Sequence, residues 1–188
     1  MIKERIIKLL KSTERSGIDN LILHMEDNGF FMAPCSGQYH LAKEGGLAEH
    51  SLNVYEFGYD HLPSIIGGDK IGWFSWAIVA ILHDLGKASY HNKPNYTPNI
   101  LKSGKQSEDK PFETNKDRLY ISHEIVSLQI ATKHIELSEE EEFAILYHNG
   151  LYVASGRDIQ GKERPLQLLL HFADMWCSRF VETEEKQK

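Results

Sequence analysis

Cysteine is scarce in this sequence, with two residues among 188. Cys35 and Cys177 lie far apart without paired spacing, which favours a reducing setting; a single disulfide between them is the alternative. Long apolar runs are also missing, because the longest, residues 73–82, is too short to cross a bilayer. Residues 1–11 alternate charges with Ile and Leu, unlike a secretory leader. We therefore expect a cytoplasmic protein that does not interact with membranes.

An excess of positive charge is absent as well. The chain has 21 Lys and Arg against 27 Asp and Glu, a net charge of −6, which argues against binding of long duplex nucleic acid through counterion release. A nucleotide or short oligonucleotide stays open as a substrate, because a bound metal supplies local positive charge. Histidine, in contrast, occurs ten times. Since histidine is a common metal ligand and acid–base group, the placement of these residues indicates the chemistry.

The patterning predicts an all-α fold. A chain of 188 residues with 41% hydrophobic residues is ordinary for one globular domain, and no segment shows the sustained alternation of a strand. Apolar periodicity with capping and turn residues predicts six or seven helices, with Pro63 and the Gly67-Gly68 pair ending the third. The expected helices cover residues 2–10, 18–28, 46–62, 71–83, 119–135, 138–148 and 165–180.

Three of the expected helices carry specific signals. Residues 71–83 are apolar on all sides, which is typical of a helix buried at the centre of a domain. Ser138 followed by Glu141 predicts a capping box at the start of the next-to-last helix. Pro165 suits the first position of the last helix.

Residues 87–118 do not fit the helical pattern and are expected to form one long irregular loop. The segment contains three prolines and many Asn, Ser and Lys residues. Between Leu85 and Arg118 there are seven Lys or Arg and four Asp or Glu, a local charge of +3. A loop that closes over an anion is one interpretation, and a disordered surface insertion is the other.

The dipeptide His83-Asp84 follows directly on the buried apolar helix. Burying a carboxylate beside an imidazole is costly unless a cation or hydrogen bonds compensate for it. Gly86 permits a tight turn after the pair, and Lys87 places a positive charge where it could meet a phosphate. The pair is therefore a candidate for metal binding.

His50 and Asp174 are the next candidates, each with a structural alternative. His50 shares a helix face with apolar residues, where a histidine is often an ordinary core residue. Asp174 lies in an apolar helix where a carboxylate is rarely buried unless paired or bound to metal. An ion pair with Arg179 or Lys162 is the alternative for Asp174. His171 falls near the same face, as an outer partner or a substitute ligand.

The order His50, His83-Asp84 and Asp174 on three helices resembles the HD superfamily of metal-dependent phosphohydrolases. The resemblance covers roughly residues 45–180, and its most specific parts are Gly45-Gly46-Leu47-Ala48-Glu49-His50-Ser51 and His83-Asp84-Leu85-Gly86-Lys87. It implies a single-domain HD-type helical bundle over residues 45–182, with N-terminal helices in 1–44 packed on it and a charged tail at 183–188. It also implies that the four residues bind a divalent metal.

Two further histidines sharpen this resemblance. Members of the superfamily with two metals carry additional histidines between the His-Asp pair and the final Asp, and His123 and His148 stand in that interval. By resemblance they would hold a second metal, with Asp84 bridging the two; a single metal is the alternative. The Gly-Tyr-Pro signature of the cyclic-dinucleotide branch is missing, and we expect no nucleic-acid-binding domain ahead of the candidate region.

The resulting functional prediction is hydrolysis of a phosphate ester or anhydride of a nucleotide or short oligonucleotide, with Asp84 and Lys87 as catalytic residues. Mixed histidine and carboxylate ligands favour one or two Mn, Fe, Co, Ni or Zn ions over Mg. Lys87, His40, Lys116 and Arg118 are the candidates for substrate contact. Alternatives are 3′-5′ exonuclease or phosphodiesterase activity on RNA or DNA ends, and a non-catalytic nucleotide-binding sensor. Residues 2–10 could also serve a homo-oligomer.

Overall fold

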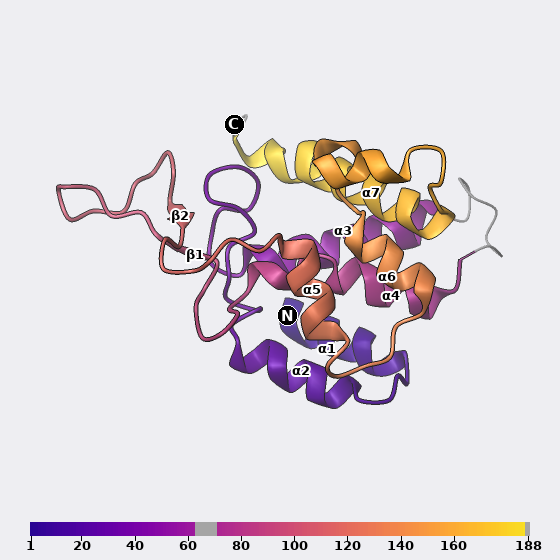
Figure 1. Cartoon of the computed structure of the whole chain (residues 1–188). Coiled ribbons are helices and arrows are strands. Elements are labelled where there is room, and N and C mark those ends of the chain that lie inside the picture. Colours follow the sequence, from indigo (N-terminus) through magenta and orange to yellow (C-terminus); the bar gives the residue numbers. More distant parts are fainter. Residues whose placement is uncertain (63–70, 187–188) are drawn as a thin grey trace.

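The computed structural model describes residues 1–62 and 71–186 and is mostly helical (Figure 1). The α-helices are α1 (Ile2–Ser12), α2 (Ile18–Asp27), α3 (Gly46–Leu62), α4 (Trp73–Leu82), α5 (His123–Ala131), α6 (Glu139–Leu146) and α7 (Pro165–Arg179). Short 3-10 turns are η2 (Leu85–Lys87), η3 (Gly150–Tyr152), η4 (Ala154–Ile159) and η5 (Val181–Lys186). The expected stop of α3 at Pro63 and the Gly67-Gly68 pair lies outside the described residues.

Helix α4 lies at the centre of the core, as its uniformly apolar sequence predicts. Every residue from Trp76 to Leu82 is buried, and α4 packs against α1, α3, α6 and α7. Helices α1 and α2 contribute Ile6, Leu10, Leu21 and Met25 to the same buried cluster. No helix in residues 1–62 and 71–186 is long and apolar enough to cross a membrane.

Helix α5 is shorter than the sequence suggested. It begins at His123 and not at Leu119, and it ends at Ala131. Leu119 and Tyr120 are almost fully exposed, so their apolar character gave a false helical signal. Burial of Val126 and Ile130 against the core begins only after Ser122, whose extended backbone precedes the helix.

The capping box at the start of α6 is confirmed. The Ser138 hydroxyl accepts from the Glu141 backbone N–H, and the Glu141 carboxylate accepts from the Ser138 N–H. The same carboxylate binds Arg15 through both oxygens, at 2.7 and 2.9 Å, which ties the turn after α1 to α6. Helix α6 ends at Leu146, so His148 follows the helix and does not close it.

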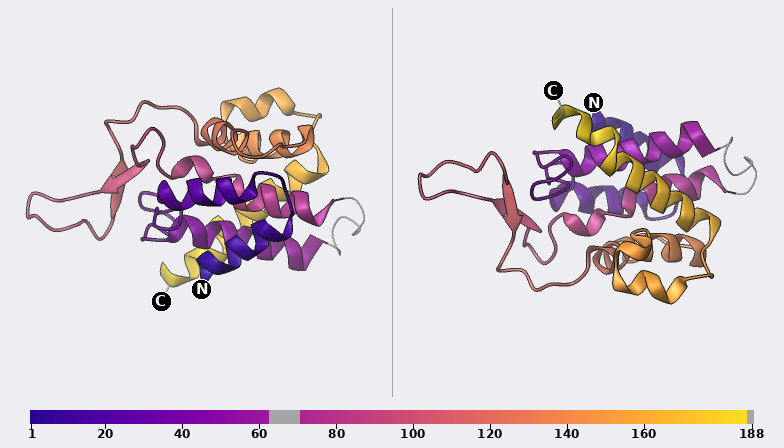
Figure 2. Two further views of the ribbon diagram at one scale, coloured as in Figure 1. Left: turned by 90° about the horizontal axis from the view of Figure 1, so that it is seen from below. Right: turned by 90° about the horizontal axis from the view of Figure 1, so that it is seen from above.

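Residues 93–116 form a projecting arm. The mostly helical fold agrees with the prediction, but this segment holds a small two-stranded sheet where one irregular loop was expected. Strands β1 (Tyr96–Pro98) and β2 (Phe112–Thr114) pair antiparallel, and an isolated bridge joins Ile100 to Gln106. Both views in Figure 2 show this arm extending away from the helices. The ordered hydrogen bonding argues against the disordered insertion that the composition left open.

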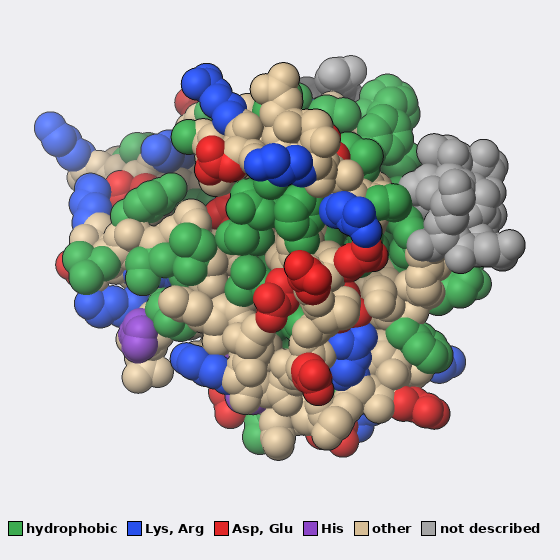
Figure 3. Space-filling view, turned by 45° about the vertical axis from the view of Figure 1, so that its right-hand side comes forward, with side chains coloured by type: hydrophobic (Ala, Val, Ile, Leu, Met, Phe, Trp, Pro, Cys, Tyr) green, Lys and Arg blue, Asp and Glu red, His purple; other side chains and the backbone are tan. Residues whose placement is uncertain are grey.

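The arm carries exposed basic side chains and is fastened to the body at its base. Lys102, Lys105 and Lys110 are exposed, and Figure 3 shows Lys and Arg side chains along the edge where the arm lies. At the base, the Arg118 guanidinium donates to the backbone carbonyls of Gly86 and Ala88, both at 2.9 Å. Arg118 thereby joins the arm to the turn that follows α4.

Candidate metal centre

The four residues of the predicted metal site come together from three helices. His50 lies in α3, His83 is the residue that ends α4, and Asp174 lies in the middle of α7. His50 Nε2 is 3.1 Å from Asp174 Oδ1 and 3.3 Å from His83 Nε2. His50 and His83 are completely buried. The structure therefore brings these side chains together. Asp174 pairs with His50 and not with Arg179 or Lys162, which were the alternative ion-pair partners.

The carboxylate of Asp84 lies between two pairs of imidazoles. Its Oδ2 is 3.7 Å from His50 Nε2 and 3.5 Å from His83 Nε2. Its Oδ1 is 3.1 Å from His123 Nε2 and 3.6 Å from His148 Nε2. We call His50, His83, Asp84, His123, His148 and Asp174 the six-residue cluster. Both extra histidines singled out by the sequence belong to it.

The turn after α4 aims His83 and Asp84 into the cluster and requires glycine at position 86. A Cβ on Gly86 would lie 2.2 Å from the carbonyl oxygen of His123, so no larger residue fits without displacing α5. Ser127 of α5 strengthens this contact, because its hydroxyl accepts from the Gly86 N–H at 2.8 Å and lies 2.8 Å from the His83 carbonyl. The close approach of α5 brings His123 to Asp84.

Three of the histidines have their second ring nitrogen engaged by the fold. Nδ1 of His83 lies 2.9 Å from the Ala80 carbonyl, and Nδ1 of His148 lies 2.8 Å from the Ile145 carbonyl. Nδ1 of His50 lies 3.0 Å from both oxygens of Glu182. With Nδ1 as the donor, each Nε2 presents a lone pair to the cluster, which is the tautomer that a metal-binding histidine needs.

Glu182 is a site residue that the sequence gave no reason to select. It lies in η5 in a run of acidic residues, yet its side chain is almost completely buried. The Asn53 amide also donates to it, at 3.0 Å. Burial opposes the charged form, but His50 keeps the pKa of Glu182 below its usual value. A buried carboxylate that orients a ligand histidine is typical of metal sites.

The cluster concentrates buried charge. Burial opposes ionisation of Asp84, but Lys87, whose Nζ is 2.6 Å from Oδ2, and His83 hold the pKa of Asp84 well below its usual range. Burial likewise opposes ionisation of Asp174, whose pKa is nevertheless lowered by His50. Asp84 is fully buried and the Asp174 side chain is 18% exposed, so two ionised carboxylates lie in a largely buried site, which is stable only where cations compensate for them.

The donor set could hold a metal ion. His50, His83 and Asp174 offer ligand atoms within 4.8 Å of one another, as do His83, Asp84 and His148. Asp84 Oδ1 is buried and has no hydrogen-bond partner among the described residues. A carboxylate oxygen left without a hydrogen bond beside two imidazole nitrogens is explained by a cation between them.

Further polar groups adjoin the His123 and His148 side of the cluster. Asn149 Nδ2 donates to Glu124 Oε1 at 2.6 Å and lies 3.1 Å from His148 Nε2. Glu124 is buried, and its Oε2 has no hydrogen-bond partner among the described residues. Neither residue was selected from the sequence, because only the fold brings α5 and the end of α6 together.

Cys35 and His40 lie on the other side of His50. Cys35 Sγ is 3.2 Å from His40 Nε2, and with His50 these two form a third group of ligand atoms within 4.8 Å. Burial raises the pKa of the Cys35 thiol to about 12 and lowers that of His40 to about 4. His40 was a substrate candidate by sequence, whereas Cys35 was not selected as a site residue.

A cavity of about 660 Å³ leads to the cluster. Its walls carry more cationic and neutral groups than acidic ones, and Asp174 is the one carboxylate in the lining. The lining residues are Tyr39, His40, Lys87, Asn149, Tyr152, His171, Asp174, Met175, Ser178, Arg179 and Thr183. Since Asp174 belongs to the cluster and Lys87 contacts Asp84, a molecule in this cavity would contact the cluster directly.

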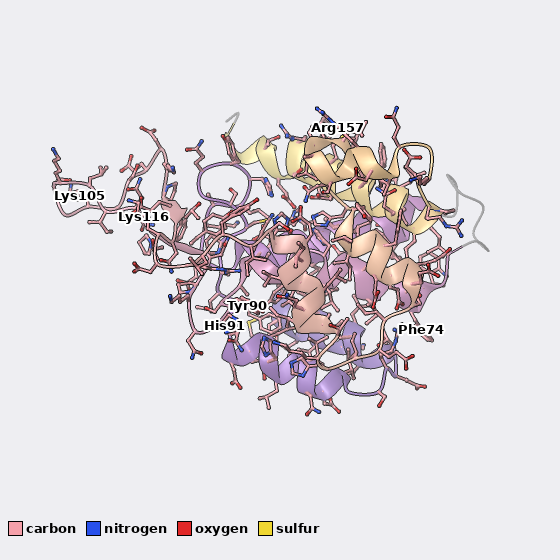
Figure 4. The ribbon with its side chains drawn as sticks, in the orientation of Figure 1. Phe74, Tyr90, His91, Lys105, Lys116 and Arg157 are labelled. Carbon is pink, nitrogen blue, oxygen red and sulfur yellow. The ribbon has the colours of Figure 1, made fainter. Side chains whose placement is uncertain are left out.

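Other residues predicted for the site lie elsewhere or act indirectly. Lys116 lies on the projecting arm (Figure 4) and pairs with Glu113 at 3.3 Å. Arg118 binds backbone carbonyls at the base of the arm. Neither lines the cavity. His171 lines the cavity, and its Nδ1 lies 2.7 Å from the His148 carbonyl.

Comparison with protein-family models, with curated proteins and with solved structures finds no match to this chain. The function is therefore inferred from the residues and geometry of the cluster and its cavity.

Replacing Glu182 by glutamine is expected to weaken Mn²⁺ binding about 10-fold, at the low end of the effect of outer-shell partners of metal ligands. Glutamine keeps an acceptor for His50 Nδ1 but removes the negative charge. Calorimetric titration with Mn²⁺ measures the effect, and Glu163→Gln, an exposed glutamate, is the matched control. Equal affinities of the wild type and Glu182→Gln would show that Glu182 does not support the site.

Proposed function

We propose that this protein is a metal-dependent phosphohydrolase that cleaves a phosphate ester or anhydride of a nucleotide or short oligonucleotide. The observation that carries the proposal is the position of Asp84, with one oxygen facing His50 and His83 and the other facing His123 and His148. A carboxylate can bridge two ions through its two oxygens, so this arrangement supports a centre of two metals. The same residues support an HD-type assignment.

The ligand types favour Mn, Fe, Co, Ni or Zn over Mg, because imidazole suits transition metals and Mg prefers oxygen. A divalent metal bound there would lower the pKa of its water from about 15.7 towards 7 and so supply hydroxide at neutral pH. Three imidazoles are held in orientation for such binding. His50 is held by the Glu182 carboxylate, His83 by the Ala80 carbonyl and His148 by the Ile145 carbonyl.

Lys87 and Asn149 are suited to receive the substrate. Both line the cavity, and Lys87 carries a charge stabilised by Asp84: burial opposes that charge, but Asp84 raises the pKa of Lys87 well above its usual value. An ammonium that stays protonated can attract a phosphate as a point charge. The Asn149 amide, 3.1 Å from His148, can donate to a phosphate oxygen beside the cluster.

Activity with a substrate panel tests the proposal. The purified protein with Mn²⁺ is offered nucleoside mono-, di- and triphosphates, cyclic nucleotides and short RNA, and phosphate release or chain shortening is measured. Hydrolysis of at least one member is expected, with loss of that activity in His83→Ala. The control His134→Ala changes a histidine that contacts His24, away from the cluster.

Two outcomes would contradict the enzymatic proposal. If no member of the panel turns over, or if His83→Ala is as active as the wild type, the cluster does not catalyse phosphate hydrolysis under these conditions. Tight nucleotide binding, measured by calorimetry, without turnover would instead support a non-catalytic nucleotide-binding sensor.

A further inference from the structure

We propose that the cavity holds a single nucleotide unit, its phosphate beside Lys87 and its base stacked on Tyr152 next to Arg179. This inference rests on the proposed function and narrows its substrate class to nucleoside phosphates, with the base as a recognised part. The side chains that would bind the base lie at the rim of the cavity and have no role in the chemistry at the cluster.

Tyr152 is an exposed aromatic residue held in place on several sides. Tyr152 is 65% exposed. Nevertheless its hydroxyl donates to Met175 Sδ at 3.5 Å, and its ring centroid lies 5.9 Å from that of His171. His171 is itself fixed by the His148 carbonyl. A tyrosine that is ordered but open to solvent offers a stacking surface with little entropy to lose on binding.

Arg179 adds a cation at the same place. Its guanidinium lies 5.6 Å from the centroid of the Tyr152 ring, and it forms no ion pair among the residues that the structure describes. Because the guanidinium lies over the Tyr152 ring, it adds its own planar surface to that of the ring, and a base can stack on this surface or form hydrogen bonds with it. Of the lining residues only Asp174 is acidic, whereas Lys87 and Arg179 are basic, so the lining has a net positive formal charge although the chain is acidic overall.

The spacing along α7 matches a molecule with a phosphate at one end and an aromatic group at the other. Asp174, in the cluster, and Arg179, at the rim, are five residues apart, which is about 7.5 Å along a helix. A phosphate beside Asp174 and Lys87 therefore leaves the rest of the molecule next to Arg179 and Tyr152. The cavity volume of about 660 Å³ is in the range of small-molecule sites.

A second tyrosine reaches the cavity from a rigid loop. Tyr39 is exposed and lines the cavity. The Ser36 hydroxyl accepts from the Tyr39 N–H at 2.9 Å and donates to the His40 carbonyl at 2.8 Å. The Gly37 carbonyl accepts from Phe112 N–H, which joins this loop to β2. The backbone of this loop is therefore held in place, and Tyr39 offers a second aromatic side chain to the nucleoside.

The test compares AMP with ribose 5-phosphate, which has the same phosphate and sugar but no base. With Mn²⁺ present, the wild type is expected to bind AMP about fivefold or more tightly than ribose 5-phosphate, the lower end of the value of one base–aromatic stack. Tyr152→Ala should remove most of this preference without changing the affinity for ribose 5-phosphate. Tyr152→Phe, which keeps the ring, should retain it.

Affinities are measured by calorimetry first and KM values for hydrolysis second. The base site and the hydrolytic activity are thereby tested independently. Tyr120→Ala, which removes an exposed tyrosine outside the cavity lining, is the control. If AMP is bound with a preference that depends on Tyr152 but is not hydrolysed, the base site stands and the proposed activity on AMP fails. If AMP and ribose 5-phosphate bind equally, or Tyr152→Ala keeps the preference, the base site is wrong.

Discussion

Replacing Asp84 by asparagine is expected to lower kcat at least about 1,000-fold, on the order of 4 kcal/mol of transition-state stabilisation. Asp84 is the one residue of the six-residue cluster whose two oxygens face both pairs of imidazoles. Asparagine has the same shape, but its amide nitrogen cannot bind a cation and it carries no charge. Bound Mn²⁺ per chain, measured by elemental analysis, should fall together with kcat.

A second variant separates loss of the site from loss of the fold. In Asp84→Asn the ammonium of Lys87 loses its carboxylate partner at 2.6 Å, and an unpaired charge in a buried site destabilises a protein. The double variant Asp84→Asn/Lys87→Met removes both charges and should fold while staying inactive. Circular dichroism and thermal unfolding verify the fold of each variant.

The matched control is Asp158→Asn, an exposed aspartate in η4 that is outside the cavity lining. It should keep the activity and the metal content of the wild type. Full activity in Asp84→Asn with a normal fold would show that the cluster does not need a bridging carboxylate, and it would contradict the proposed two-metal centre.

The parts of the fold that were predictable from the sequence have local causes. A run of apolar residues without a polar face has to be buried, and α4 is buried from Trp76 to Leu82. The Ser138-to-Glu141 spacing fixes a capping box because both partners belong to one turn. His83 and Asp84 were identifiable for a related reason. These polar residues follow directly on the buried helix, so they lie at the core however the other helices are arranged.

Glu182, Glu124 and Asn149 reach the site only through tertiary structure and were therefore missed, whereas the sequence had selected all six residues of the cluster. Glu182 looks like any member of its acidic run until η5 places it against His50. Glu124 and Asn149 meet only because α5 and α6 pack together. Spacing alone also fails to separate cluster histidines from others: His24 and His134 come from distant segments and contact each other, 5.0 Å between ring centroids, outside the cluster.

The arm was mispredicted for a different physical reason. Each of its strands has only three residues, and the partners Tyr96 and Thr114 are separated by 17 intervening residues that contain prolines and a glycine. Three residues are too few to show alternation, so the pairing has no signature in the sequence. The exposed Leu119 and Tyr120 had the opposite effect, since apolar residues outside the core extended the predicted α5 beyond its true start.

Adding Mn²⁺ at about 100 times its dissociation constant is expected to raise the melting temperature by about 5–10 °C. Binding to the native state alone at that concentration contributes about 2.7 kcal/mol, and for a domain of this size 1 kcal/mol corresponds to about 2–4 °C. The physical source of the gain is the buried charge of Asp84 and Asp174, which costs free energy to desolvate until a cation lies between the carboxylates and the imidazoles.

Thermal unfolding with Mn²⁺, and again after excess EDTA, measures this shift, which should be reversible. Asp84→Asn should show a much smaller rise, because one bridging ligand is lost, whereas Asp158→Asn should respond like the wild type. An equal rise in Asp84→Asn would place the stabilising ion elsewhere on the molecule. No rise in the wild type would mean that Lys87 and the neighbouring imidazoles already compensate for the two carboxylates. The cluster would then be an internal ion-pair network, and the metal-dependent reaction would lose its physical basis.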